Sequence, residues 1–139
     1  MRRAQITVEF LIIFAVLAIL SFALVKFYVD LNADASATAA RLSARSSAIL
    51  LATAIDKISQ AGDGASISLE LPERLSTGAT YSLAIYPSLR RVEVVSTAHA
   101  GAMSVDVPLA TNKISGTTEL WGGARVSVRN KEGVVFVQA

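Results

Sequence analysis

The chain has 139 residues, which is enough for one domain and an additional element but too few for two full domains. It contains no cysteine, and this excludes disulfides, thiolate zinc sites and cysteine nucleophiles. The formal net charge of +2 comes from 13 basic and 11 acidic side chains, and Arg2 and Arg3 supply the whole excess. The excess of positive charge therefore lies in a short segment at the N-terminus. We expect no nucleic-acid partner.

The first predicted element is an apolar helix near the N-terminus. From Phe10 to Val25 only Ser21 interrupts the apolar run, whose length as a helix would be about 24 Å. With the flanks from Ile6 to Val29, the segment reaches the length of about 30 Å that spans the hydrocarbon core of a bilayer. Because arginines precede the run and none follows it closely, we expect the N-terminus in the cytoplasm and the chain beyond Lys26 outside.

The helical pattern continues beyond the apolar run, since no proline or glycine occurs between Phe27 and Ala61. Helical spacing continues in one stripe, Leu42, Ile49, Ala52 and Asp56, and in an adjacent apolar one, Leu51, Ile55 and Ile58. We expect Ile49, Ile55 and Ile58 to pack on the β domain. Gly62 and Gly64 on either side of Asp63 predict that the helix ends near Ala61. A helix from about Gln5 to Gln60 would be roughly 84 Å long, more than one small domain can bury.

After Gly64 the apolar pattern changes to a period of two, which is typical of β-strands. The alternating runs are Ile67 to Leu71, Tyr81 to Ile85, Met103 to Val107 and Val126 to Val128. Turn-forming residues separate the strands at Pro87-Ser88, Gly101, Thr111-Asn112, Gly122-Gly123 and Asn130 to Gly133. About seven short strands over 65–139 predict a compact antiparallel sandwich or barrel-like domain. The predicted fold class is therefore α+β, a long N-terminal helix followed by a small antiparallel β domain.

The sequence offers no catalytic arrangement. His99 is the only histidine, which excludes clusters of several histidines and most catalytic triads, and it is expected in a loop. The stretch Gly62 to Gly64 lacks the succession of carboxylates of a calcium loop, and Gly122-Gly123 lacks the lysine and hydroxyl of a phosphate-binding loop. We therefore predict that the protein is not an enzyme and has no catalytic residue, cofactor or metal site.

The segment from Gln5 to Leu11, Gln-Ile-Thr-Val-Glu-Phe-Leu, resembles the class III signal peptide of archaeal type IV pilins. That pattern is Gln, any residue, Ser or Thr, any residue, Glu, an aromatic residue and Leu, after a few basic residues. The matching positions are Gln5, Thr7, Glu9, Phe10 and Leu11, with Arg2 and Arg3 as the basic prefix. The long helix and the β domain predicted above suit the same family. Glu9 favours a pilus over an archaeal flagellum, whose subunits usually lack this acid.

The resemblance implies cleavage between Ala4 and Gln5 by a prepilin peptidase, so that residues 1–4 are a leader peptide. Residues 5–61 would then form the transmembrane and polymerising helix, and 65–139 the extracellular β domain. A pilus assembly ATPase and its membrane platform would move subunits from the cytoplasmic membrane into a helical homopolymer, an adhesion pilus at the cell surface. Glu9 would pair with the new amino group of Gln5 in a neighbouring subunit. The expected hydrophobic core of the filament consists of Phe10, Leu11, Ile12, Ile13, Phe14, Val16, Leu17, Ile19, Leu20, Phe22, Leu24 and Val25.

Two alternatives make different use of the same N-terminal segment. In the first, the chain is a single-pass, membrane-anchored extracellular binding module that does not polymerise, and Glu9 only stabilises the N-terminus of the helix. In the second, the chain is a secreted soluble domain, with Arg2 and Arg3 opening a conventional signal peptide that is cut after Ala33-Asp34-Ala35. The acid within the leader and the helical pattern across the proposed cut argue against this second alternative.

Overall fold

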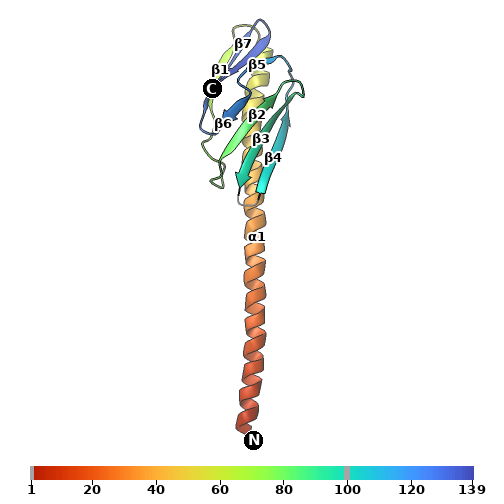
Figure 1. Ribbon diagram of the computed structural model, residues 1–139, viewed down its shortest axis with the longest axis vertical. Helices are drawn as coiled ribbons and strands as arrows, with labels where there is room; N and C mark the ends of the chain where they lie inside the picture. The colour runs from red at the N-terminus through yellow and green to blue at the C-terminus, as the bar shows by residue number, and fades with distance from the viewer. Residues whose placement is uncertain (1, 99–100) are drawn as a thin grey trace. The chain divides into compact units, whose positions relative to one another are not determined.

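A computed structural model describes the backbone of residues 2–98 and 101–139, and the side chains of residues 8–96 and 103–139. These ranges form one helix, α1, and eight strands, most of which are labelled in Figure 1. Their bounds are α1 Arg2–Ala61, β1 Ser66–Glu70, β2 Tyr81–Tyr86, β3 Arg91–Ala98, β4 Gly101–Pro108, β5 Ile114–Gly116, β6 Glu119–Trp121, β7 Arg125–Lys131 and β8 Val134–Gln138. The chain divides into two compact units, Met1–Ser36 and Ala37–Ala139, and α1 contributes to both. His99, expected in a loop, lies outside the described residues.

The predicted fold class, a long N-terminal helix followed by a β domain, is confirmed. The strands form two sheets of four, in the orders β1-β7-β8-β5 and β4-β3-β2-β6, and the sheets do not close into a barrel. The described strand pairs are antiparallel except for β5, which runs parallel to β8 with Ile114 opposite Val135. The antiparallel expectation is wrong at this edge because the chain enters β5 from the other sheet, so no hairpin sets the direction of the strand.

The described residues form eight strands where about seven were expected, and β5 and β6, with 3 residues each, are too short to show an alternating pattern. The predicted turns at Pro87-Ser88 and Gly122-Gly123 are present. Gly101, expected in a turn, instead begins β4, and Asn130 and Lys131 belong to β7. The β7–β8 hairpin turns at Glu132 and Gly133, whose φ angles of 55° and 79° suit a two-residue type I′ turn.

The C-terminal part of α1 is the centre of the hydrophobic core of the unit Ala37–Ala139. Its buried apolar side chains are Ala40, Ala44, Ala48, Leu51, Ala52, Ala54, Ile55 and Ile58. Most of them pack with residues from both sheets, among them Leu83 and Ile85 of β2, Val92 and Val94 of β3, Val126 and Val128 of β7, and Val135 and Val137 of β8. Figure 1 shows the strands gathered around this part of the helix. A single helix therefore joins the two sheets into one core.

The buried face of this helix differs in part from the predicted stripes. Ile55 and Ile58 are buried as expected, whereas Leu42 and Ile49 are 64% and 44% exposed. The buried stripe instead continues toward the N-terminus through alanines such as Ala44 and Ala48. Small side chains on this face let the strands pack closely against the helix, since protein interiors are filled to nearly crystalline density. Helical spacing, which guided the prediction, identified Ala52 and Leu51 on the buried face but not these alanines.

Backbone and side-chain contacts define the end of α1. Gly62 follows the helix with a positive φ of 88°, a conformation that glycine adopts without strain at a helix C-terminus. The buried side chain of Asn130 donates from Nδ2 to the backbone carbonyl of Ile58 over 3.1 Å, and its Oδ1 accepts from the backbone N–H of Gly133 over 3.1 Å. The Ile58 carbonyl is one of the carbonyl groups of the last helical turn, which have no hydrogen-bond partner within the helix. By binding it, Asn130 links the end of the helix to the β7–β8 hairpin.

Tyr81 on β2 closes another part of the core. Its hydroxyl donates to the backbone carbonyl of Pro72 over 2.6 Å. Gly122 leaves room for this arrangement, because a Cβ there would lie 2.6 Å from the carbonyl oxygen of Glu73 and 2.9 Å from Cε1 of Tyr81. Burial raises the pKa of the Tyr81 hydroxyl above its ordinary value of 10.0, with a side-chain hydrogen bond to Ser47 acting in the opposite direction.

The burial pattern predicts the stability of a fragment comprising residues 37–139. We expect Leu51→Ala to lower its free energy of unfolding by about 2–5 kcal/mol, because Leu51 is fully buried and truncation leaves a cavity. Leu42→Ala is the matched control on the exposed face of the same helix, and it should change the free energy by less than about 0.5 kcal/mol. Urea denaturation followed by circular dichroism gives both values. Equal losses for the two variants would contradict the assigned buried face.

The raised pKa of Tyr81 predicts loss of stability at alkaline pH. A group whose pKa is higher in the folded than in the unfolded state contributes stability that is complete below the unfolded value, here 10.0, and is lost as the pH rises through the folded value. The free energy of unfolding of the fragment should therefore fall as the pH rises above 10.0, and Tyr81→Phe should show a smaller fall. At neutral pH the variant should be less stable by about 0.5–1.5 kcal/mol, since it lacks the hydrogen bond to Pro72. Denaturation at several pH values gives this fall for both proteins. If the free energy of unfolding fell equally with pH in the wild-type fragment and in Tyr81→Phe, this role of Tyr81 would be refuted.

Candidate functional site

The most unusual surface of the described chain is the apolar part of α1 in the unit Met1–Ser36. Every residue of the expected filament core is exposed, from 51% for Val16 to 77% for Phe22. These residues are Phe10, Leu11, Ile12, Ile13, Phe14, Val16, Leu17, Ile19, Leu20, Phe22, Leu24 and Val25. Soluble monomers rarely expose such a large continuous apolar patch, and one of this kind marks a site of association with a membrane or another protein.

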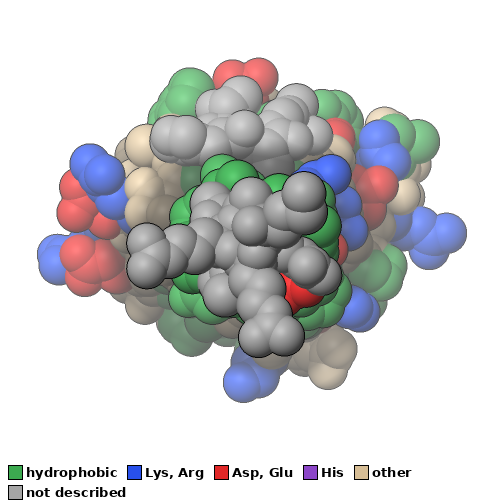
Figure 2. All heavy atoms as spheres, turned by 90° about the horizontal axis from the view of Figure 1, so that it is seen from below, with side chains coloured by type: hydrophobic (Ala, Val, Ile, Leu, Met, Phe, Trp, Pro, Cys, Tyr) green, Lys and Arg blue, Asp and Glu red, His purple; other side chains and the backbone are tan. Residues whose placement is uncertain are grey.

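The apolar residues surround the helix. Successive residues of an α-helix are rotated by about 100°, so the uninterrupted run Phe10 to Phe14 covers every side. Figure 2, seen from the N-terminal end, shows hydrophobic side chains along most of the rim around the residues drawn in grey. The rings of Phe10 and Phe14 stack with their centroids 6.4 Å apart. By length and composition, α1 includes a segment able to cross a membrane, and none of that segment is buried in the protein.

The polar side chains near this run are compatible with an apolar environment. Ser21 donates from Oγ to the backbone carbonyl of Leu17 over 2.8 Å, and Asn32 donates from Nδ2 to the carbonyl of Tyr28 over 3.0 Å. Both bonds join residues one turn apart in the helix, so the serine hydroxyl and one amide hydrogen need no water as a partner. Ser21 therefore does not prevent burial of the run in lipid or in a protein core.

Glu9 is the exception, because it is charged, exposed and directly precedes the apolar run. Among the residues whose side chains are described, it makes no ion pair or hydrogen bond. Since α1 begins at Arg2, its first turn contains no acid, and Glu9 lies about two turns into the helix. The stabilising effect of an acid on a helix N-terminus is confined to the first turn. In the described chain Glu9 thus lies beyond the first turn, and the helix-stabilising role considered for the anchored module stays a prediction.

The predicted cleavage site lies on the same helix. The backbones of Ala4 and Gln5 are helical, whereas their side chains lie outside the described residues. Cleavage between them and the pairing of Gln5 with Glu9 therefore stay predictions. The expected partner of Glu9 belongs to a neighbouring subunit.

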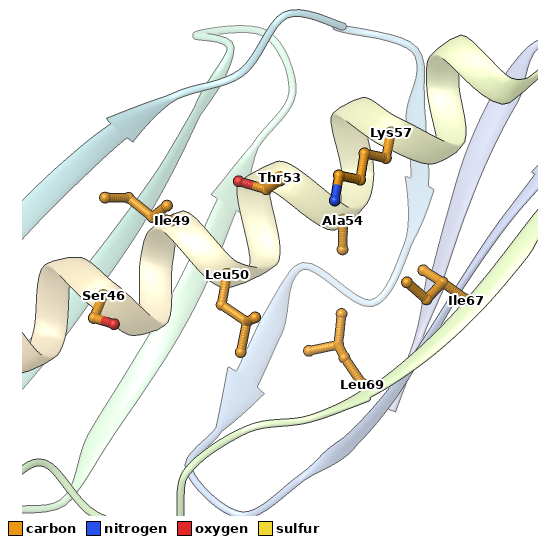
Figure 3. A pocket seen from close by; sticks show the side chains of 8 residues that line it. All are labelled: Ser46, Ile49, Leu50, Thr53, Ala54, Lys57, Ile67 and Leu69. Atoms are coloured by element: carbon orange, nitrogen blue, oxygen red, sulfur yellow. The ribbon is translucent and has the colours of Figure 1, made fainter.

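A groove of about 330 Å³ lies on the unit Ala37–Ala139, between α1 and β1 (Figure 3). Its lining consists of Ser46, Ile49, Leu50, Thr53, Ala54, Lys57, Ile67 and Leu69. Strand β1 lies at the edge of its sheet, with a neighbouring strand on one side only. Ile67 and Leu69 therefore lie at the margin of the core. Lys57 is the only charged side chain in the lining, so the groove is an apolar contact surface and has no acid–base pair for catalysis.

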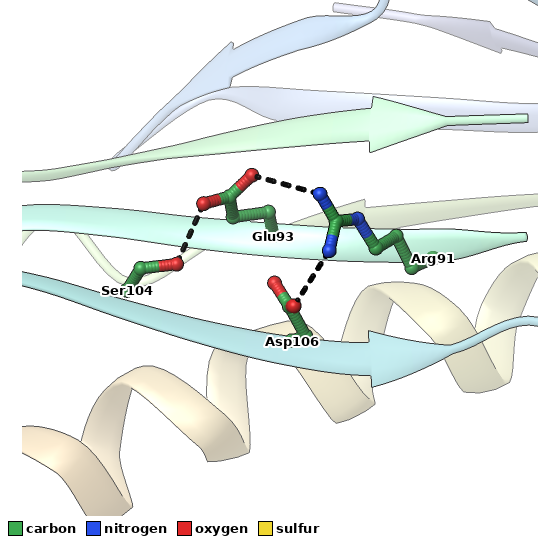
Figure 4. Close-up of polar contacts among 4 residues, drawn as sticks. All are labelled: Arg91, Glu93, Ser104 and Asp106. Atoms are coloured by element: carbon green, nitrogen blue, oxygen red, sulfur yellow. Dashed lines mark hydrogen bonds and ion pairs between the residues drawn. The ribbon is translucent and has the colours of Figure 1, made fainter. Parts of the chain in front are cut away.

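A polar cluster lies on β3 and β4 (Figure 4). Arg91 lies 2.9 Å from Asp106 and 3.9 Å from Glu93, and Glu93 accepts a hydrogen bond of 2.6 Å from the hydroxyl of Ser104. The Arg91 guanidinium also lies over the ring of Tyr86, 5.3 Å from its centroid. Exposed ion pairs contribute at most about 1 kcal/mol each, but together these contacts cross-link the edge strand β4 to β3. We assign the cluster a structural role.

No protein family, curated protein or solved structure matches the chain. Within the described residues, no three His, Asp or Glu side chains come together as metal ligands would. The structure supports a long N-terminal apolar helix followed by a β domain, a layout consistent with that of pilins. The sequence identified the residues of the candidate site, and the structure adds that the apolar ones are exposed. The groove was missed, because Ile49 was expected in the core and no pattern marked β1 as an edge.

Proposed function

We propose that this protein is the structural subunit of an archaeal type IV adhesion pilus. The observation that carries the proposal is the exposed apolar run Phe10 to Val25, preceded by Glu9 at the position that the pilin pattern requires. The run needs an apolar environment before assembly, which the cytoplasmic membrane supplies, and a second one afterwards, which the core of a helical filament supplies. The unit Ala37–Ala139 has its own core and therefore remains folded in both states.

The proposed assembly assigns a role to each part of the motif. A prepilin peptidase cleaves between Ala4 and Gln5, and the assembly ATPase with its membrane platform moves the mature subunit into the filament. Transfer of an apolar helix from lipid to an apolar filament core gives little net hydrophobic free energy, so close packing and polar pairing must select the register. Glu9 provides this selection, because a buried carboxylate without a partner is strongly destabilising. Its partner is the amino group of Gln5 in a neighbouring subunit, a group that exists only after cleavage.

The alternative of a membrane-anchored binding module that does not polymerise uses the same exposed helix. It is favoured by the length and composition of α1, which suffice for one membrane crossing. It gives no role to Glu9 outside the first helical turn. The two proposals differ in one observable: only a pilus subunit leaves the membrane to form filaments.

The first experiment isolates filaments sheared from the cell surface and identifies their subunit. We expect filaments composed mainly of this protein, with a mature N-terminus at Gln5, because the pilin-like pattern begins there. Electron microscopy and mass spectrometry of the intact subunit provide the measurement. Subunits confined to the membrane fraction would support the anchored module. A mature N-terminus at Ser36 would instead establish a conventional signal peptide and refute the pilus proposal.

Substitution of Glu9 separates pairing from a local effect on the helix. If Glu9 pairs within the filament, Glu9→Leu and Glu9→Gln should abolish filaments, since removing one partner of a buried ion pair costs about 3–5 kcal/mol per subunit. Glu9→Leu should still be inserted and processed, because a more apolar helix favours the bilayer. The measurement is the number of surface filaments relative to processed subunit in the membrane fraction. Glu73→Gln is the control at an exposed acid of the other unit, and normal filament numbers with Glu9→Leu would exclude the pairing.

A further inference from the structure

Strand β6 carries a tryptophan on its outer side. Trp121 is 67% exposed, the highest value among the large hydrophobic side chains described in the unit Ala37–Ala139. Its neighbour Leu120 is fully buried in the core that includes the C-terminal part of α1. Because adjacent side chains of a strand point to opposite faces of the sheet, Trp121 points away from that core. Tryptophan is among the residue types that contribute most to the stability of protein interfaces.

The backbone next to Trp121 is held in place by two hydrogen bonds. The N–H of Gly122 donates to the backbone carbonyl of Tyr81 over 3.2 Å, and the N–H of Gly123 donates to that of Pro72 over 3.1 Å. An anchor on a backbone that is already ordered loses less conformational entropy when it binds a partner. The fold therefore presents an uncovered tryptophan on a fixed support.

The groove in Figure 3 offers a matching surface on a different side of the unit. It opens beside α1, whereas Trp121 points away from the core around α1. Its lining includes Ile49, Leu50 and Ile67, which are 44%, 45% and 40% exposed. The groove, of about 330 Å³, is at the lower end of the range of ligand pockets, so it suits a single large side chain.

The charges beside the two surfaces are complementary. Lys57 is exposed and is the only charged side chain of the groove lining. Glu119 is exposed and lies two residues before Trp121, so its side chain points to the same face of β6. Neither charge makes an ion pair among the described side chains. We propose that Trp121 of one subunit inserts into the groove of its neighbour in the filament, where Glu119 pairs with Lys57.

The proposed contact joins two different surfaces of the same chain. Each subunit inserts Trp121 into one neighbour and receives the tryptophan of another, which is a head-to-tail contact of the kind that builds filaments. Both interactions fit together, because Glu119 and Trp121 are about 7 Å apart along the strand and Lys57 lies about 5 Å, one helical turn, beyond Thr53 of the lining. This inference rests on the proposed function and adds a contact between β units to the contacts between apolar helices.

Intrinsic fluorescence tests the insertion in the full-length protein, because Trp121 is the only tryptophan of the chain. In filaments its emission should lie at shorter wavelength than in detergent-solubilised subunits. Acrylamide should quench it at least about threefold less, since insertion removes the indole ring from water. Unchanged emission and quenching on assembly would overturn the insertion. The same protection in subunits held in lipid vesicles without filaments would assign Trp121 to the membrane surface and would also overturn it.

Truncation of the tryptophan tests its contribution to assembly. Trp121→Ala should lower the number of surface filaments at least about tenfold, as the loss of a central interface residue does. Leu89→Ala is the matched control, because Leu89 is 61% exposed and does not line the groove, and it should leave filament numbers unchanged. Normal filament numbers with Trp121→Ala, or an equal loss with Leu89→Ala, would contradict the proposed contact.

Exchange of the two charges tests whether the groove is the partner. Glu119→Lys and Lys57→Glu each place like charges in the proposed contact, so filament numbers should fall about threefold or more. The variant with both substitutions restores opposite charges and should return to within about twofold of the wild-type number. No recovery in this variant would overturn the docking of Trp121 in the groove. Absence of filaments from the wild-type protein would instead refute the proposed function itself.

Discussion

An α-helix satisfies its own backbone hydrogen bonds, but it cannot cover its own side chains. In this protein the same helix, α1, carries two apolar segments that meet this constraint in different ways. Around Leu51 and Ile55, apolar residues occupy one stripe, and two sheets from the same chain cover it. From Phe10 to Val25, apolar residues surround the helix, and the described chain covers none of them. The β unit therefore covers its own apolar stripe, whereas the apolar side chains of the N-terminal segment remain exposed.

The sequence predicted those features that depend on simple periodicity. A helix without proline or glycine up to Ala61, the stop at Gly62 and the alternation in strands such as β2 and β7 all follow from local rules, and the structure contains them. Prediction failed at Ile49, which was expected to pack on the sheet and is 44% exposed. The sheets pack on alanines such as Ala44 and Ala48. The direction of β5 depends on a crossing between sheets, which no local pattern encodes.

The candidate site was predictable to a different extent. The apolar run and Glu9 are evident in the sequence because charge and hydropathy contrast sharply there. Their exposure is a property of the structure that the sequence pattern does not give. The role of Glu9 stays a prediction, because its expected partner in the filament belongs to another subunit.

Hydrophobic burial and charge pairing have complementary limits in such an assembly. Apolar burial is proportional to area and has no direction, so a helix apolar on all sides can slide or rotate against its neighbours at small cost. In the proposed filament, a charge next to the apolar run would change this, because Glu9 would be stable only where a partner meets it. One such contact would select a stagger and a rotation that hydrophobic contacts alone leave undetermined.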